Sequence, residues 1–468
     1  MDFSLISIKY NLEDNYMKKL LVLLLSIMLC MLVFVSCGVP KSADDVMAKI
    51  DRKMDSLKSY QAEMTAKFST VLNGYQCSAD FSGQVIEING KFKEYYYYDT
   101  MEGTTEIKDD KGGVLESVDM KALQAFNEGK MFVLTEQGDM EQKLYSALDK
   151  DDYIAYLEKQ NNALDIDFNA CVNKTFTKNE DKTWTVHYSG YTKSAIDEFV
   201  EQFGADELFE EEIKDMAITI RANKDFTVKD MEIKLVFENE STTSNFRMTA
   251  QYSKYNEATP IVDTLNVNNY REVADCRLLT DIEDMLETLE EAESGSFVLD
   301  LSQKLTYGVY TQTQKSSETD TVTYGKKNGK YFYTVRASYD GSDIDISYEN
   351  GKQEISYSGG SQTANQTEDE AKAFINGLIN TACYESIRVS NIEKIGEGTY
   401  KIVCSKPNEN LYQPIFSSLG MRPTVNQTIT VTIRDGKITK MESNLNASGF
   451  NVTYDDAEFE LVSVITFN

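Results

Sequence analysis

Apolar residues recur along this chain in two patterns, one with a helical period and one that alternates along a strand. Apolar positions three and four residues apart predict an amphipathic helix, and they are Met47, Ile50, Met54 and Leu57. Alternation with polar residues predicts a half-buried antiparallel strand directly afterwards, and its apolar members are Ala62, Met64, Ala66 and Phe68. The first half of the chain therefore begins as a helix that enters a sheet.

The same order of patterns returns in the second half of the chain. A second amphipathic helix is predicted from Leu279, Ile282, Leu286 and Leu289, and alternating strand residues follow at Phe297, Leu299, Leu301, Leu305 and Tyr307. Later landmarks also recur: a strand and short helix that ends at Gly204 or Gly420, and a strand pair that ends in Lys-Asp-Met231 or Thr-Lys-Met441. Ordered repetition of this kind predicts two tandem domains with one plan.

Each copy also predicts a second helix between its strands. These helices are expected at 145–157 and 367–379, and Thr367 with Glu370 forms a possible capping box. Further strands are expected at 91–98 and 330–336. The fold class predicted is α+β, with an antiparallel sheet covered on one face by helices in each copy. Because Pro260 interrupts strand pairing, we expect domains at 43–262 and 263–468.

The amino-terminal segment has the pattern of an exported lipoprotein. Residues 20–35 are apolar apart from one Ser and one Cys, they follow Met17-Lys-Lys, and they lead into Ser36-Cys37. We expect translation to start at Met17, residues 1–36 to form a cleaved signal peptide, and Cys37 to carry a lipid before a short tether, 37–42. The alternative is an uncleaved anchor helix. Either places the remaining chain outside the cytoplasm on the cell membrane.

Charge and cysteine usage exclude several classes of function. The net charge is −29 and no Lys/Arg-rich stripe offsets it, which disfavours nucleic acid as a partner. Beyond the leader and Cys37, five Cys remain, and an odd number argues against a full disulfide framework. His187 is the only His, and no CxxC occurs, so neither a metal site nor another cofactor site is expected.

Two local patterns carry a family resemblance. Leu57-Lys-Ser-Tyr60 enters the alternating strands, and a late Thr-Ile-Arg strand turns into a strand with Lys229-Asp-Met231 in the first copy and with Lys440-Met441 in the second. In this the chain resembles, as two tandem copies over most of residues 41–468, the LolA and LppX superfamily of lipoprotein and lipid carriers. The resemblance implies that each copy is an antiparallel half-barrel whose concave face is covered by helices, with an apolar cavity for acyl chains.

On that basis the expected function is binding of a lipid or another hydrophobic ligand by a membrane-anchored lipoprotein. The expected lining residues are Met64, Phe68, Tyr96, Tyr98, Leu299 and Leu301. Packed core explains the same residues, so the alternative is a non-catalytic scaffold or sensor that docks to another envelope protein. Enzyme activity is not expected, because His187 reads as a solvent-facing strand residue and no other His supports nucleophilic catalysis. The acidic clusters at 149–152, 210–212 and 290–293 read as solvated surface.

Overall fold

Antiparallel strand pairing organises both halves of the chain, which divides into two units, Met1–Tyr270 and Arg271–Asn468. The structure is a computed structural model that describes residues 40–72, 75–90, 94–109, 111–162, 171–192, 212–238, 243–290, 292–307, 312–339, 342–384, 388–407, 423–452 and 455–468. The leader, Cys37 and the two short helices expected before Gly204 and Gly420 lie outside the described residues.

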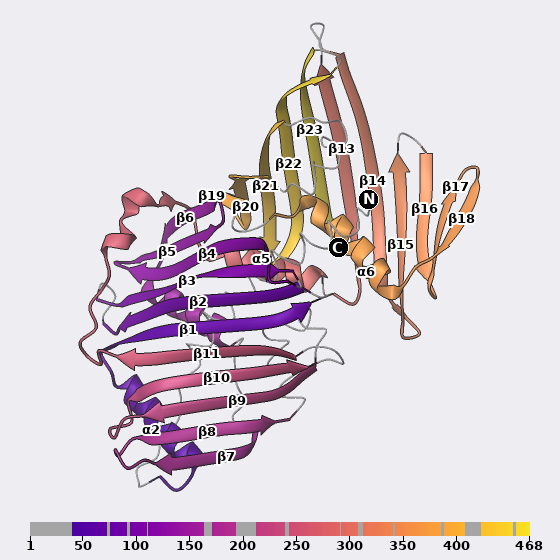
Figure 1. Cartoon of the computed structure of the whole chain (residues 1–468). Coiled ribbons are helices and arrows are strands. Elements are labelled where there is room, and N and C mark those ends of the chain that lie inside the picture. Colours follow the sequence, from indigo (N-terminus) through magenta and orange to yellow (C-terminus); the bar gives the residue numbers. More distant parts are fainter. Residues whose placement is uncertain are drawn as a thin grey trace. The chain divides into compact units, whose positions relative to one another are not determined.

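Unit 1 contains one large antiparallel sheet. Its elements are α2 (Ala43–Asp55), β1 (Ser59–Leu72), β2 (Tyr75–Ile88), β3 (Tyr96–Lys108), β4 (Val114–Asn127), β5 (Lys130–Gln137), β6 (Met140–Ala147), α3 (Lys150–Asn162), β7 (Cys171–Lys178), β8 (Trp184–Tyr191), β9 (Glu212–Ala222), β10 (Val228–Glu238) and β11 (Thr243–Ser253), followed by short 3-10 turns at Asp263–Leu265 and Val267–Asn269. The strands lie in the order β6-β5-β4-β3-β2-β1-β11-β10-β9-β8-β7 (Figure 1). The last strand of the unit, β11, therefore pairs with the first.

Unit 2 repeats this order. Its elements are β12 (Arg271–Glu272), α5 (Leu278–Glu290), β13 (Gly295–Tyr307), β14 (Gln312–Lys327), β15 (Lys330–Tyr339), β16 (Ser342–Glu349), β17 (Lys352–Tyr357), β18 (Gly360–Asn365), α6 (Glu368–Ile379), a 3-10 turn at Asn380–Ala382, β19 (Val389–Gly396), β20 (Thr399–Cys404), β21 (Thr424–Arg434), β22 (Lys437–Val452) and β23 (Asp455–Phe467). Its sheet runs β18-β17-β16-β15-β14-β13-β23-β22-β21-β20-β19 (Figure 1). Strand for strand, the two sheets have the same topology.

One face of each sheet is apolar, and we call it the inner face. In unit 1 a single register row crosses it through Tyr188, Ile218, Ile233, Met248, Ala66 and Phe81. All six side chains are buried. Directly opposed residues of antiparallel strands point to the same side, so this row continues one core across six strands. The opposite, outer face carries the polar partners.

The helices of unit 1 cover its inner face. Helix α2 packs on β7 and β8 through Val46, Met47 and Ile50, and the Ser42 side chain accepts a hydrogen bond from Asp45 N at its amino end. Helix α3 contributes Tyr153, which stacks on Phe126 with ring centroids 4.7 Å apart. The first of these helices is where the sequence predicts it.

The helices of unit 2 occupy the inner face of its own sheet. Helix α5 packs on β22, and α6 packs on β15 through Phe374, whose ring stacks on Tyr333 at 5.2 Å. The predicted capping box is present: Glu370 N donates to Thr367 Oγ1, and Thr367 N donates to a Glu370 carboxylate oxygen.

The structure changes the expected balance of helix and sheet and the expected start of one helix. The described chain is mostly β with short helices, so the sheets dominate more than the α+β class implies, and neither sheet closes into a barrel among the described residues. Residues 145–147 end strand β6, and the helix begins only at Lys150. The segment that contains the expected boundary at 262/263 packs on the outer face of unit 1, where Ile261, Leu265 and Tyr270 join a buried cluster.

Met231 and Met441 occupy equivalent inner-face positions in the two units and are both buried. We expect Met231→Ala and Met441→Ala each to lower the free energy of unfolding of its own unit by about 2–5 kcal/mol, because each leaves a cavity. Trp184 is the only Trp and lies in unit 1, so denaturation followed by its fluorescence should shift for Met231→Ala alone. The exposed Val262→Ala is the control. An equal shift of the fluorescence transition by Met441→Ala would show that the units unfold together.

Candidate functional site

Only some of the residues that were expected to line a ligand site lie on the inner faces of the sheets. Met64 on β1 and Leu299 on β13 are buried in packed cores, whereas Phe68 and Leu301, further along the same strands, are half-buried. Packing around Met64 is tight, since a Cβ added at the opposing Gly83 would lie 2.4 Å from Thr100 O and 3.3 Å from Met64 Cε. These two positions therefore serve as core.

Tyr96 and Tyr98 lie on the outer face, opposite to Met64 and Phe68. Cross-strand register pairs Tyr98 with Ile86, which pairs in turn with Gln61 on the outer face of β1. Both tyrosines are buried beneath the segment that precedes Tyr270, and Tyr96 Oη donates to Ile261 O and accepts from Ile261 N, both at 2.9 Å. The six expected residues thus do not form one surface.

The inner face beside α3 carries an aromatic cluster that the sequence did not single out. Tyr97 and Phe126 are opposed on β3 and β4, and Tyr153 of α3 lies over both rings, with centroids 5.9 and 4.7 Å away. All three side chains are fully buried. Tyr95 joins them from the residue before β3. This cluster closes the inner face of unit 1 at β3 and β4.

A carboxyl group is buried next to the aromatic cluster. Asp99 is 2% exposed, and Tyr97 Oη donates a hydrogen bond to its Oδ2 at 3.2 Å. Its Oδ1 has no hydrogen-bond partner among the described residues. Burial raises the pKa of Asp99 well above the ordinary value of an aspartate. The sequence does carry a signal for this buried group. Asp99 follows Tyr95 and Tyr97 at two-residue spacing, so it occupies a strand position at which an apolar residue is expected.

Unit 2 buries a second carboxyl group on its inner face. Asp320 on β14 is 5% exposed, and its Oδ1 also has no hydrogen-bond partner among the described residues. Its side chain shares a hydrogen bond with half-buried Glu318, two residues earlier on the same face. Burial, followed by the charge of Glu318, raises the pKa of Asp320 to about 7. The polar run Ser316–Asp320 concealed this position, because it shows no apolar alternation.

An apolar patch lies beside this carboxyl group on the inner face. Its members come from β16 and β17 and are Ile344, Ile346, Ile355 and Tyr357. The three isoleucines are half-buried and Tyr357 is 44% exposed. Register joins the patch to the carboxyl group, since Asp320 is opposed to Ala337 and Ala337 to Ile344. This part of the inner face is accessible, in contrast to the cluster around Tyr97.

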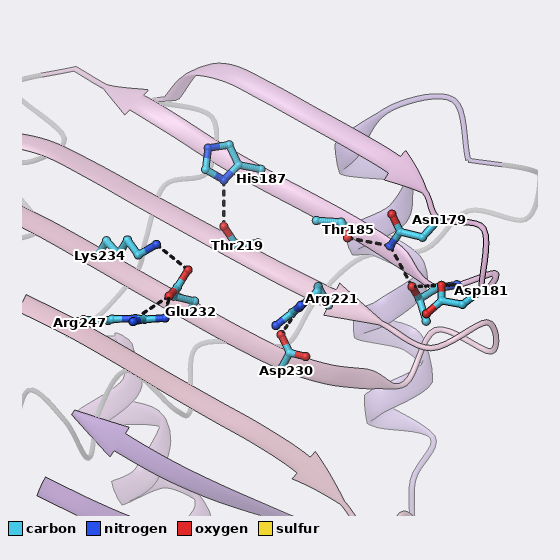
Figure 2. Close-up of polar contacts among 11 residues, drawn as sticks. Asn179, Asp181, Thr185, His187, Thr219, Arg221, Asp230, Glu232, Lys234 and Arg247 are labelled. Atoms are coloured by element: carbon cyan, nitrogen blue, oxygen red, sulfur yellow. Dashed lines mark hydrogen bonds and ion pairs between the residues drawn. The ribbon is translucent and has the colours of Figure 1, made fainter. Parts of the chain in front are cut away.

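The outer face of unit 1 is hollowed over β8–β11 and β1, with a volume of about 650 Å³. Figure 2 shows that its charged side chains contact one another across the strands. Arg221 donates to Asp230 at 2.6 Å, and Glu232 lies 2.6 Å from Arg247 and 2.9 Å from Lys234. A smaller hollow on the outer face of unit 2 includes Lys304, which lies 3.9 Å from Glu460. These exposed ion pairs keep the outer faces polar and contribute about 0–1 kcal/mol each.

His187 lies on this polar face and not in a catalytic arrangement of the described residues. It is half-buried, and its Nδ1 is hydrogen-bonded to Thr219 Oγ1 at 2.9 Å (Figure 2). Cys77, Cys171, Cys276, Cys383 and Cys404 form no disulfide within the described part of the chain. No group of three or more potential metal ligands is found among the described residues. No described helix is both long enough and apolar enough to cross a membrane.

Comparison with known proteins identifies no family. No family model and no curated protein matches the chain. A putative AttH from Nitrosomonas europaea is 6% identical over 88% of this chain and 93% of its own, with a TM-score of 0.15. A putative outer membrane lipoprotein-sorting protein domain from Vibrio parahaemolyticus is 8% identical over 41% of this chain and 92% of its own, with a TM-score of 0.16. A double mutant of Transferrin Binding Protein B from Haemophilus parasuis Hp5 is 6% identical over 87% and 76%, with a TM-score of 0.14. These low scores carry no argument about function.

The buried carboxyl group of Asp320 makes the stability of unit 2 depend on pH. Because folding raises its pKa from 3.8 to about 7, its contribution is fully present below about pH 4 and is lost as the pH rises to about 7. Asp320→Asn, which stays neutral, should lack this loss and gain on the order of 2 kcal/mol relative to the natural chain at about pH 8. Denaturation at about pH 5 and pH 8, followed by circular dichroism, measures the difference. Parallel curves for both proteins would contradict the assignment.

Proposed function

We propose that this chain is a lipid-anchored extracytoplasmic lipoprotein that binds a hydrophobic ligand, a lipid or another acyl-chain compound, on an inner sheet face. The observation that carries the proposal is the accessible apolar patch of Ile344, Ile346, Ile355 and Tyr357 in unit 2. Apolar side chains left half-exposed beside a buried core gain about 25 cal/mol for each Å² of apolar surface that a ligand covers. The membrane is the expected source of such a ligand.

The location follows from the leader rather than from the fold. The apolar stretch 20–35 and the Ser36-Cys37 junction support export, cleavage and lipidation at Cys37. The strongly acidic chain supports a role away from nucleic acid, and a role in binding rather than catalysis is consistent with His187 being held by Thr219. The partners that we propose are therefore the membrane and its lipids.

A second candidate function rests on a different observation. Met64 and Leu299 are fully packed, and the Tyr97, Phe126 and Tyr153 cluster closes much of the inner face of unit 1. A filled core of this kind favours a scaffold or sensor that docks to another envelope protein through its surface. The two functions differ in whether a small hydrophobic molecule binds in stoichiometric amounts.

Substitution of the proposed lipid site tests the location. We expect Cys37→Ser to move the protein from the membrane fraction to the soluble extracytoplasmic fraction, because the variant lacks the thiol that would carry the lipid anchor. Fractionation and immunoblotting measure the shift, and Cys77→Ser is the matched control because it leaves the leader intact. Retention of Cys37→Ser in the membrane would favour the uncleaved anchor helix.

Native mass spectrometry tests the ligand. The Cys37→Ser chain, purified gently from the producing cell, should carry a lipid-sized adduct that extraction identifies. A fluorescent fatty acid or a fluorescent lipid should also bind to it, and Tyr357→Ser should weaken that binding about tenfold by removing apolar contact. Val114→Ser, an exposed apolar residue of unit 1, is the control. A bare protein mass with no uptake of either probe would favour the scaffold or sensor.

A further inference from the structure

Asp320 and Glu318, which we call the carboxyl pair of unit 2, lie at the end of an apolar row of inner-face residues. The row crosses β14, β15, β16 and β17 through successive cross-strand pairs. Asp320 is opposite Ala337, Ala337 is opposite Ile344, and Ile344 is opposite Tyr357. Neighbouring strands are about 4.8 Å apart, so the row spans about 14 Å. It has one acidic end and one apolar end, which is the layout of a surface for an amphiphile.

No basic side chain among the described residues forms an ion pair with the acidic end of the row. Among the described residues, the neighbouring charge that raises the pKa of Asp320 is that of Glu318, which is also acidic. The neighbouring side chains on β13 and β15, Leu299 and Ala337, carry no charge. Buried carboxyl groups in proteins are normally paired with a base or fully hydrogen-bonded, but Asp320 Oδ1 has no hydrogen-bond partner in the part of the chain that the structure describes.

The described basic residues on the inner-face side of these strands pair elsewhere, Lys326 with Glu293 and Lys372 with Glu368. Arg336 and Lys304 lie on the other side of the sheet. Arg336 alternates with the inner Val335 and Ala337, and it donates to Asp345 on the outer face at 3.2 Å. Lys304 likewise lies on the outer face, next to Glu460. Their side chains therefore do not neutralise the carboxyl pair through the sheet.

We propose that unit 2 binds an amphiphile with a primary-amine head, which Asp320 and Glu318 hold while the alkyl chain lies along Ala337, Ile344 and Tyr357. This inference rests on the proposed function and names the ligand class. An ammonium group has three donors and no acceptor, so beside half-buried Glu318 it supplies the positive charge that the carboxyl pair lacks. A fatty acid would instead bring a third carboxyl group to the same end.

Unit 1 does not offer the same site. Its buried Asp99 is 2% exposed, and the rings of Tyr97 and Tyr153 lie against one another on the same inner face. At the register positions of Asp320, Ala337 and Ile344, unit 1 carries Gly83, Met101 and Ala122, so its equivalent row has no carboxyl group at its end. We therefore expect one amine-binding site in each chain.

Calorimetric titration of the full Cys37→Ser chain with decylamine, decanol and decanoate tests the head-group preference. We expect decylamine to bind at least tenfold more tightly than decanol, and decanoate to bind most weakly. Asp320→Asn should remove the preference for decylamine and leave decanol affinity within about threefold, because it changes only the polar end. Glu318→Gln should act in the same direction.

Two controls separate charge from folding. Asp345→Asn removes a carboxylate from the outer face of the same unit and should leave all three affinities unchanged. Retained decanol binding by Asp320→Asn shows that the variant is folded. Since Asp320 must lose its proton to pair with an ammonium group, decylamine should bind more tightly at about pH 8 than at about pH 6. Its binding should release a proton at about pH 6, where Asp320 is largely protonated.

The outcomes distinguish this inference from the proposed function. Equal binding of decylamine, decanol and decanoate would overturn the amine preference and leave the hydrophobic-ligand function standing. Binding of none of the three would overturn both. An unchanged decylamine preference in both Asp320→Asn and Glu318→Gln would show that the head group lies elsewhere and would overturn the assignment of the site.

Discussion

The two-residue alternation of the strands is the constraint on which the rest of the structure depends. A shift of one residue in any pairing would move apolar side chains such as Met248 and Ile465 to the outer face, and polar ones such as Arg247 into the core. The helices are too short to form a core of their own, and they serve to cover the apolar side of each sheet. Cross-strand register therefore determines which residues meet and which stay accessible.

The buried carboxyl groups are the clearest departures from that alternation. Taking an unpaired carboxyl group out of water is unfavourable, and Asp99 and Asp320 each retain an oxygen without a partner among the described residues. The two units can be aligned by matching the pair Met64–Gly83 of unit 1 to the pair Leu299–Asp320 of unit 2. In this alignment Asp320 falls on the strand next to that of Asp99, one inner-face position away along the strand. Both units thus accept the same unfavourable chemistry in nearly the same place.

The two units share a strand topology but differ in the residues that their sheets leave accessible. In unit 1 the inner face at β3 and β4 is closed by stacked tyrosine and phenylalanine rings, and the outer face there is covered by the segment before Tyr270. In unit 2 the equivalent rings of Tyr333, Tyr348 and Phe374 also stack on the inner face, but Ile344, Ile355 and Tyr357, further along β16 and β17, stay half-buried or exposed. One copy is built chiefly as a core, and the other leaves an apolar area open beside its carboxyl pair.

The sequence by itself determined the features that depend on local spacing. The helix at Met47–Met54, the cap at Ser42, the capping box at Thr367 and the repeated order of elements follow from residues within a few turns of one another. The antiparallel strands were predictable for the same reason. The start of α3 at Lys150 was not predictable, because Tyr145 fits both the helical spacing of the residues after it and the alternation of strand β6, to which it belongs.

Only the tertiary structure decided which face each residue occupies and what covers it. Tyr96 and Tyr98 became outer-face residues because β3 pairs with β2 in one register, and the segment before Tyr270, distant in sequence, buries them. Buried Asp320 and half-buried Glu318 became neighbours beside an apolar patch for the same reason. A strand's own alternation defines two faces, but only its neighbours and the segments that pack on it determine which face is buried and which is accessible.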